Sequence, residues 1–171
     1  MTIDAYKTRI QMYERFPKDA VGAECGVWLA DNAVNLVNVA EPKLMYCVDP
    51  YAQPKLGDKS FNIARNLLLG FDCVKFIRQW DWDWFDTVED DHLDWVYIDT
   101  LHTDDSTRRE LAGVLPKVKK GGIIAGHDFC ITPKWGIGVI GPVIEQIQSG
   151  TIELIAIATE QPFPSFMCRK V

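Results

Sequence analysis

Acidic residues stand at the ends of four strand-like apolar segments of this 171-residue sequence. The segments are AVGAEC, KLMYCVD, DWVYID and GIIAGHD, and their carboxylates are Glu24, Asp49, Asp99 and Asp128. A carboxylate at the end of a buried strand is costly unless it has a partner, and ligands of parallel sheets bind beyond the carboxyl ends of the strands. The spacing therefore predicts one ligand site along a single edge of a sheet.

Gly26 and Asp49 indicate the chemistry of that ligand. Gly26 would let the backbone approach a ligand closely after the first strand. Asp49 follows 23 residues later, where a carboxylate accepts hydrogen bonds from ribose hydroxyls. The turn that contains Gly26 lacks the G-x-G-x-x-G pattern that a dinucleotide pyrophosphate needs beside a helix N-terminus. A nucleoside ligand without phosphates is therefore expected.

His102 and His127 fall at the mouth of the same predicted site. A histidine whose pKa lies near neutrality can remove the proton of a hydroxyl group, so both are candidate bases. In a second interpretation, Asp99, His127 and Asp128 bind a divalent cation that lowers the pKa of a hydroxyl. Two carboxylates suit Mg²⁺, and an imidazole ligand favours Mn²⁺. In a third interpretation, Asp99 and Asp128 orient the neighbouring histidines or backbone amides.

The elements that position these residues are short apolar runs alternating with helical patterns from about residue 19 to residue 150. This alternation is typical of βαβ units around a mainly parallel sheet. Asp31 or Asn32, and later Thr103, are expected to cap helices. The last two strand-like runs, TIELIAIAT and SFMCRK, have no helix between them and should pair antiparallel. We expect a Rossmann-like three-layer α/β/α sandwich with a mostly parallel seven-stranded sheet and an antiparallel C-terminal strand.

Length and composition limit the other possibilities. The length predicts one domain over residues 1–171, with residues 1–18 as an N-terminal helical segment. A net charge of −6 argues against a broad nucleic-acid interface, and no apolar run reaches the ~18 residues that span a membrane. The five cysteines include no C-x-x-C pair and the N-terminus is polar, which favours a cytoplasmic protein. A homodimer remains open.

Four segments resemble motifs of class I S-adenosylmethionine-dependent methyltransferases. AECGVWLADNA resembles motif I in its E-x-G-V-W-x-G form, and LMYCVDPY resembles the motif II strand. DWVYIDTLHTDDS is similar to a D-x-V-Y-I-D-G-x-H segment, and LPKVKKGGIIAGHDF to the strand-five signature of the same short branch (methyltransferase domain family 24). The resemblance covers roughly residues 20 to 150. Ala30 and Thr100 depart from it, because the family has glycine at both positions.

The resemblance implies that S-adenosylmethionine is the cofactor. Its methionine end would lie near Glu24 and Gly26, its ribose at Asp49, and its adenine near residues 79–82. One of the alternating tryptophans Trp80, Trp82 and Trp84 is expected to stack on adenine, and at least two to pack in the core or at its rim. The expected cofactor-binding residues are Glu24, Gly26, Val27, Trp28, Asp49, Pro50, Gln79, Trp80, Asp81, Trp82 and Asp99. The expected catalytic residues are His127, His102 and Asp99.

These expectations together indicate O-methylation of a small-molecule or sugar hydroxyl, with metal assistance left open. The sequence does not identify the methyl acceptor. Two other classes of function stay open. One is a domain that binds S-adenosylmethionine without catalysis or needs a partner subunit. The other is a hydroxylase-like enzyme on the same scaffold, since a fold does not fix a function.

Overall fold

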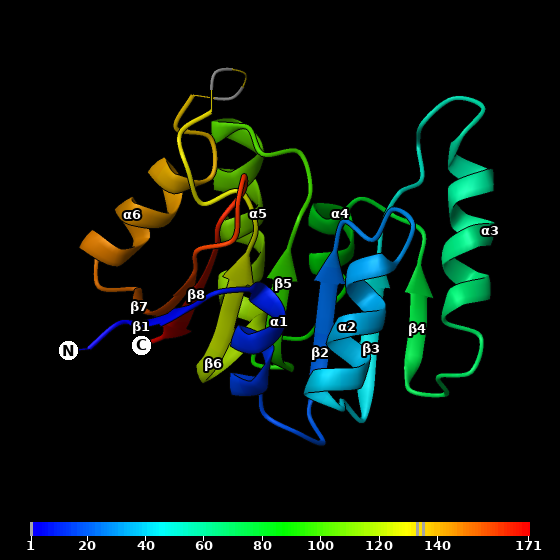
Figure 1. The fold of residues 1–171 in the computed structure, drawn as a ribbon, viewed down its shortest axis with the longest axis horizontal. Coiled ribbons are helices and arrows are strands. Elements are labelled where there is room, and N and C mark those ends of the chain that lie inside the picture. The colour runs from blue at the N-terminus through cyan, green and yellow to red at the C-terminus, as the bar shows by residue number, and fades with distance from the viewer. Residues whose placement is uncertain (1, 133, 135) are drawn as a thin grey trace.

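The computed structural model describes residues 2–132, 134 and 136–171. Their central feature is one sheet with the strand order β1-β7-β8-β6-β5-β2-β3-β4 (Figure 1). Strand β8 pairs antiparallel with β6 and with β7, and the other pairs are parallel. The strands are β1 (Asp4–Tyr6), β2 (Val21–Cys25), β3 (Leu44–Val48), β4 (Val74–Ile77), β5 (Leu93–Ile98), β6 (Val118–Gly126), β7 (Ile152–Ala158) and β8 (Ser165–Lys170).

Helices cover both faces of the sheet and complete three layers. One apolar core joins the sheet to α1, α2 and α3, through residues such as Met12, Leu36 and Ala64. A second core joins the other face to α4, α5 and α6. The helices are α1 (Arg9–Met12), α2 (Asp31–Ala40), α3 (Gly57–Leu67), α4 (Asp81–Phe85), α5 (Asp104–Lys117) and α6 (Ile140–Gln148), with a 3₁₀ turn η1 (Tyr13–Arg15) after α1. No helix within the described ranges is long and apolar enough to cross a membrane.

The sheet confirms the predicted Rossmann-like architecture and adds one strand. Strand β1 lies in the segment expected to be helical, and it pairs in parallel with β7, with Asp4 opposite Ala156 and Tyr6 opposite Ala158. Its three residues are exposed or half-buried, so they carry no alternating apolar pattern. The pairing depends on backbone hydrogen bonds to a distant strand, and a local sequence pattern cannot show it. The prediction of seven strands was therefore one too few.

The strand order creates a switch point between β2 and β5. From β2 the chain proceeds outward through β3 to β4, and then returns to build β5 and β6 on the other side of β2. A crevice forms beyond the carboxyl ends of strands at such a reversal. Close packing holds the two central strands together, because a Cβ at Gly22 would lie 2.0 Å from the ring of Trp95.

The helix starts agree with the sequence prediction at α5 and differ at α2. Thr103 caps α5, and its hydroxyl accepts a hydrogen bond from the backbone N–H of Ser106 in a capping box. At α2 the capping position is Ala30, which has no capping side chain. Asn32 instead donates its amide to buried Glu24 at 2.8 Å. The predicted cap by Asp31 or Asn32 was thus wrong, because Glu24 engages the Asn32 side chain.

Candidate active site

A cavity of about 1210 Å³ opens beyond the carboxyl ends of β2, β3, β5 and β6. It collects most of the residues singled out by the sequence and places three of them elsewhere. Glu24 is fully buried and does not line the cavity, and neither do Gln79 and Trp82. The predicted residues that line it are Gly26, Val27, Trp28, Asp49, Pro50, Trp80, Asp81, Asp99, His102, His127 and Asp128.

Gly26 fits its position because no side chain could be accommodated there. Its φ is +88°, and a Cβ would lie 1.9 Å from the backbone oxygen of Asp99. The ends of β2 and β5 therefore meet directly under the cavity. Ala30, which stands where the family has its second glycine, has a φ of +69°. It keeps the glycine-type conformation at a cost of about 1–2 kcal/mol.

Asp49 fastens the loop after β2 to the end of β3. Its Oδ2 accepts hydrogen bonds from the backbone N–H groups of Val27 at 3.0 Å and Trp28 at 2.9 Å. Its Oδ1 accepts one from the N–H of Tyr51 at 2.7 Å. A carboxylate offers about four lone-pair sites, so these bonds leave about one for a ligand hydroxyl. The predicted ribose contact therefore has room, and Asp49 has a structural function that the sequence did not show.

Trp80 and Asp81 form the wall of the cavity beside β4. Asp81 is 3% exposed, and burial raises its pKa to about 6. Its buried Oδ2 has no hydrogen-bond partner among the described residues. Trp80 stacks on Trp82 with ring centroids 4.8 Å apart and an angle of 8° between the rings. An acceptor atom beside an aromatic ring is a suitable environment for a nucleobase that carries an amino group.

The remaining predicted adenine residues have other partners. The ring of Trp82 lies under the guanidinium of Arg109 at 4.4 Å. Gln79 faces a separate cavity of about 630 Å³ beside β4. Trp84 is buried against Tyr46 and Phe85 and packs in the core.

Glu24 lies behind the cavity floor as a buried carboxyl group. Burial raises its pKa to about 8, although the hydrogen bond from Asn32 opposes this, so the group is protonated at neutral pH. Tyr13 extends the contact by donating its hydroxyl to Oδ1 of Asn32 at 2.7 Å. The second oxygen, Oε2, finds no partner within the described part of the chain.

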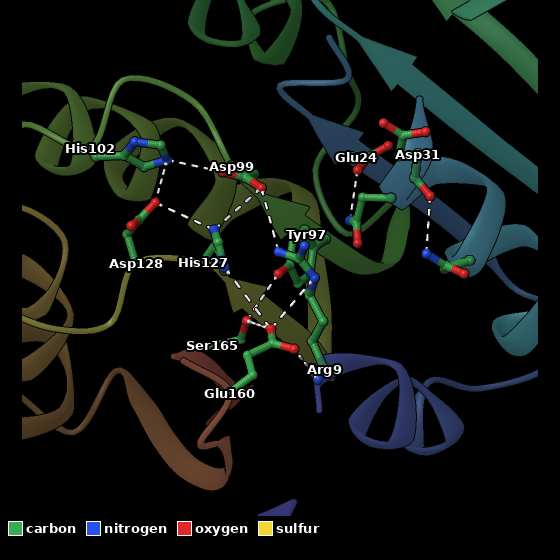
Figure 2. A network of polar contacts seen from close by, with 12 residues as sticks. Arg9, Glu24, Asp31, Tyr97, Asp99, His102, His127, Asp128, Glu160 and Ser165 are labelled. Atoms are coloured by element: carbon green, nitrogen blue, oxygen red, sulfur yellow. Dashed lines mark hydrogen bonds and ion pairs between the residues drawn. The ribbon is translucent and has the colours of Figure 1, made fainter. Parts of the chain in front are cut away.

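Two histidines and two carboxylates converge on the β5 and β6 side of the cavity (Figure 2). Nε2 of His102 lies 2.9 Å from Oδ1 of Asp99 and 2.9 Å from Oδ2 of Asp128. Nδ1 of His127 lies 3.4 Å from Oδ2 of Asp128 and 3.6 Å from Oδ2 of Asp99. The chain bends so that the adjacent residues His127 and Asp128 both reach the site. Strand β6 ends at Gly126, and Asp128 has a φ of +54°. The bend therefore lies at Asp128, while Gly126 provides room for Phe166.

The carboxylates control the charge of both histidines. Burial disfavours a charged imidazole, but hydrogen bonds with Asp128 and Asp99 raise the pKa of His102 to about 9. The same two carboxylates raise the pKa of His127 to about 9 against the effect of burial. In return, the histidines hold the pKa of Asp99 and of Asp128 below the ordinary value although burial opposes this. In the ligand-free protein both histidines are therefore proton donors at neutral pH.

The donor set also fits a divalent cation. One ligand atom each from Asp99, His102 and Asp128 lies within 4.8 Å of the others. Carboxylate oxygens suit Mg²⁺ and Mn²⁺, and the imidazole favours Mn²⁺. The histidine that joins the two carboxylates in this group is His102, whereas the sequence prediction named His127. A single imidazole N–H cannot point at two carboxylates at once, and a shared cation satisfies both.

Arg9 and Glu160 complete the site, and the sequence prediction missed both. Arg9 lines the cavity, and its Nε lies 3.5 Å from Oε1 of Glu160. Glu160 also lies 4.0 Å from Nε2 of His127. Thr100, at the second position where the family has glycine, donates its hydroxyl to buried Glu110. The contact between Arg9 and Glu160 spans 151 positions, which explains why no local pattern revealed it.

The sequence prediction took the whole chain to lack a G-x-G-x-x-G pattern, and this was wrong, because one occurs at residues 136–141 (GIGVIG). There it precedes and enters α6, ten residues after β6 ends, instead of following a strand directly. Its glycines are not among the residues that line the cavity. The pattern therefore lacks the strand–turn–helix setting of a dinucleotide site.

The strand order and the crevice at its switch point define a Rossmann-like α/β protein. The chain belongs to the methyltransferase domain family, whose sequence model matches residues 21–129. No curated protein sequence matches the chain closely enough to count as a relative.

Solved structures with the same fold include several methyltransferases. A protein of Streptococcus mutans described as a methyltransferase, in complex with SAH, is 12% identical with a TM-score of 0.72, over 95% of this chain and 96% of that chain. An rRNA methylase from Streptococcus thermophilus is 13% identical with a TM-score of 0.69, over 95% and 94% of the two chains. A precorrin-6y C5,15-methyltransferase from Geobacter metallireducens is 15% identical with a TM-score of 0.70, over 95% and 86%.

Proposed function

We propose that this chain is an S-adenosylmethionine-dependent O-methyltransferase acting on a hydroxyl group of a small molecule. The observation that carries the proposal is that one cavity holds two sets of residues. Asp49, Trp80 and Asp81 suit a nucleoside, and the cluster of Asp99, His102, His127 and Asp128 suits a hydroxyl that must lose its proton. The volume of about 1210 Å³ exceeds that of an ordinary small-molecule pocket, which leaves room for cofactor and acceptor together.

Methyl transfer requires the acceptor oxygen in line with the methyl carbon. The oxygen forms a bond to that carbon, the carbon–sulfur bond breaks with its electron pair moving to sulfur, and the acceptor proton leaves. Holding the two reactants in this geometry supplies much of the rate enhancement. The cluster on β5 and β6 is positioned to bind the acceptor, and the nucleoside residues on β3 and α4 to orient the cofactor.

The acceptor proton has two possible routes. With a pKa of about 9, roughly 1% of His127 would be neutral at pH 7, so a histidine acting alone would be an inefficient base. A divalent cation held by Asp99, His102 and Asp128 would lower the pKa of the acceptor hydroxyl, so that its proton could pass to water. We therefore favour metal assistance, with Mn²⁺ preferred over Mg²⁺.

A small-molecule acceptor is favoured over RNA by the chemistry of the cavity mouth. Trp28, Leu101 and Phe163 line the cavity with 59%, 47% and 41% of their surfaces exposed. Exposed apolar side chains beside carboxylates suit a compact acceptor with an apolar part. A phosphate backbone would meet this acidic cluster and a chain of net charge −6.

Methyl-transfer assays with S-adenosylmethionine test the proposal. The acceptors are a panel of catechols, sugars and nucleotide sugars, each assayed with Mn²⁺, with Mg²⁺ and with EDTA. We expect turnover of at least one hydroxyl acceptor with Mn²⁺ and loss of turnover in EDTA. His92→Ala is the matched control, because His92 lies beside Tyr46 at the other cavity. Methylation of an RNA transcript in place of the panel would overturn the proposed acceptor class.

A further inference from the structure

Arg9 brings a cationic group into the cavity from outside the region that the family model matches. It begins α1, whereas the match covers residues 21–129. Figure 2 shows its side chain running between Glu160 and Tyr97 toward Asp99. The cavity wall on this side is otherwise rich in carboxylates, so the position of a guanidinium there needs an explanation.

Glu160 holds Arg9 through both the backbone and the side chain. The backbone N–H of Arg9 donates to Oε2 of Glu160 at 3.1 Å, and its Nε lies 3.5 Å from Oε1 of the same residue. The side chain of Tyr97 lies beside the guanidinium (Figure 2). The contacts with Glu160 therefore position the guanidinium.

Nη1 of Arg9 is a guanidinium nitrogen that lacks a hydrogen bond to the described residues. Nη1 is buried and has no hydrogen-bond partner in the part of the chain that the structure describes. Oδ2 of Asp99 lies 4.0 Å from Nη1, which is too far for a hydrogen bond. A buried donor of a charged group without a partner is costly, and an anionic ligand group at this position would remove that cost.

The strand order indicates which ligand group comes here. Across the sheet, Asp49 follows β3, Gly26 follows β2, Asp99 follows β5, and the pair His127–Asp128 follows β6. A nucleoside at Asp49 and an acceptor at His127–Asp128 place the sulfur of the cofactor between them, above β2 and β5. The amino-acid tail attached to that sulfur then lies beside Asp99 and Arg9.

Arg9 and Asp99 match the charges of that tail. The tail is a zwitterion, with a carboxylate and an ammonium group on the same carbon atom. Asp99 directs Oδ1 to His102 and has Oδ2 on the side of Arg9. A cation and an anion side by side can bind a carboxylate and an ammonium group together.

We infer that Arg9 binds the carboxylate of the amino-acid tail of S-adenosylmethionine through its guanidinium group. The inference rests on the proposed function, because it requires this cavity to bind that cofactor. It assigns to the N-terminal segment a part in cofactor recognition, with Glu160 as the residue that positions Arg9.

Calorimetry with three ligands tests the inference. The ligands are S-adenosylhomocysteine, its 3-aminopropyl analogue, which keeps the ammonium group but lacks the carboxylate, and 5′-methylthioadenosine, which lacks the tail. Arg9→Gln should bind S-adenosylhomocysteine about 10- to 100-fold more weakly than wild type. The variant should bind the other two ligands within about twofold of wild type. Arg9→Lys, which keeps the charge, should lose less affinity for S-adenosylhomocysteine than Arg9→Gln does.

Matched controls separate recognition from folding. Arg15→Gln removes an arginine of the same segment that pairs with Asp4 and does not line the cavity, and it should bind all three ligands as wild type does. Thermal unfolding of each variant checks that the fold is intact.

Three results would overturn the inference. An equal loss of affinity for all three ligands would show that Arg9 has a structural role, in which it links the N-terminal segment to Glu160. Unchanged affinity for S-adenosylhomocysteine, with a raised KM for the methyl acceptor, would place the acceptor at Arg9. Failure of the wild-type protein to bind S-adenosylhomocysteine would refute the proposed function itself, and this result is distinguishable because it appears before any substitution.

Discussion

Glu110 is a buried carboxyl group whose effect on stability can be worked out from its surroundings. Glu110 lies on α5 and is 1% exposed. Its carboxyl group accepts a hydrogen bond from the hydroxyl of Thr100 at the cavity wall. Burial, together with the nearby charge of Asp81, raises its pKa from 4.5 to about 7. Because the pKa is higher in the folded protein than in the unfolded chain, the folded state favours the protonated group. Stability is therefore lost as the pH rises through this range.

Glu110→Gln should remove that loss. A pKa difference of this size corresponds to roughly 3 kcal/mol in total, of which about 2.5 kcal/mol is lost between pH 5 and pH 8. Glutamine keeps an oxygen that can accept the hydrogen bond from Thr100 but does not titrate. The free energy of unfolding of the variant minus that of wild type should therefore be about 2.5 kcal/mol larger at pH 8 than at pH 5.

Urea unfolding followed by tryptophan fluorescence measures this difference at pH 5, 6, 7 and 8. Glu14→Gln is the control, because Glu14 is exposed, and its stability relative to wild type should not change with pH. Parallel pH profiles for wild type and Glu110→Gln would refute the reasoning. They would show that Glu110 is ionised in the folded protein despite its burial.

Three further predictions concern the active site. Asp49→Ala should weaken binding of S-adenosylhomocysteine by about tenfold or more, measured by calorimetry beside Asp72→Ala, which changes an exposed residue; unchanged affinity in a folded variant would contradict the ribose contact. His127→Ala should slow methyl transfer at least ~100-fold while the Tm and cofactor affinity stay close to wild type, because His127 contacts the cation-binding carboxylates of Asp99 and Asp128; a large loss of stability with the rate preserved would make His127 a structural histidine. EDTA should abolish turnover and leave binding of S-adenosylhomocysteine unchanged, whereas full turnover in excess chelator would exclude the cation.

Periodicity and strand-end carboxylates were sufficient to predict the architecture. Alternating apolar runs and helical patterns predict a parallel sheet, and the carboxyl ends of parallel strands meet at one edge. Asp49, Asp99 and Asp128 therefore line one cavity as expected. Strand β1 escaped prediction because its three residues pair with β7 through backbone groups alone.

The details that the sequence could not show depend on competition between side chains. Asn32 is a good capping residue in isolation, but buried Glu24 takes its amide. Gln79 and Trp82 flank residues that line the cavity, and the start of α4 at Asp81 turns their side chains elsewhere. Arg9 and Glu160 meet across 151 positions, so their contact exists only in the folded chain. Local patterns specify each segment, and these long-range contacts decide which side chains face the ligand.

A calorimetric titration of the wild-type protein with S-adenosylhomocysteine, run in parallel with NAD, tests the central claim most directly. The nucleoside site formed by Asp49, Trp80 and Asp81 predicts saturable one-to-one binding of S-adenosylhomocysteine and no binding of NAD. Binding of NAD without binding of S-adenosylhomocysteine, or heat from neither ligand, would contradict the assignment of this cavity to the methyl donor.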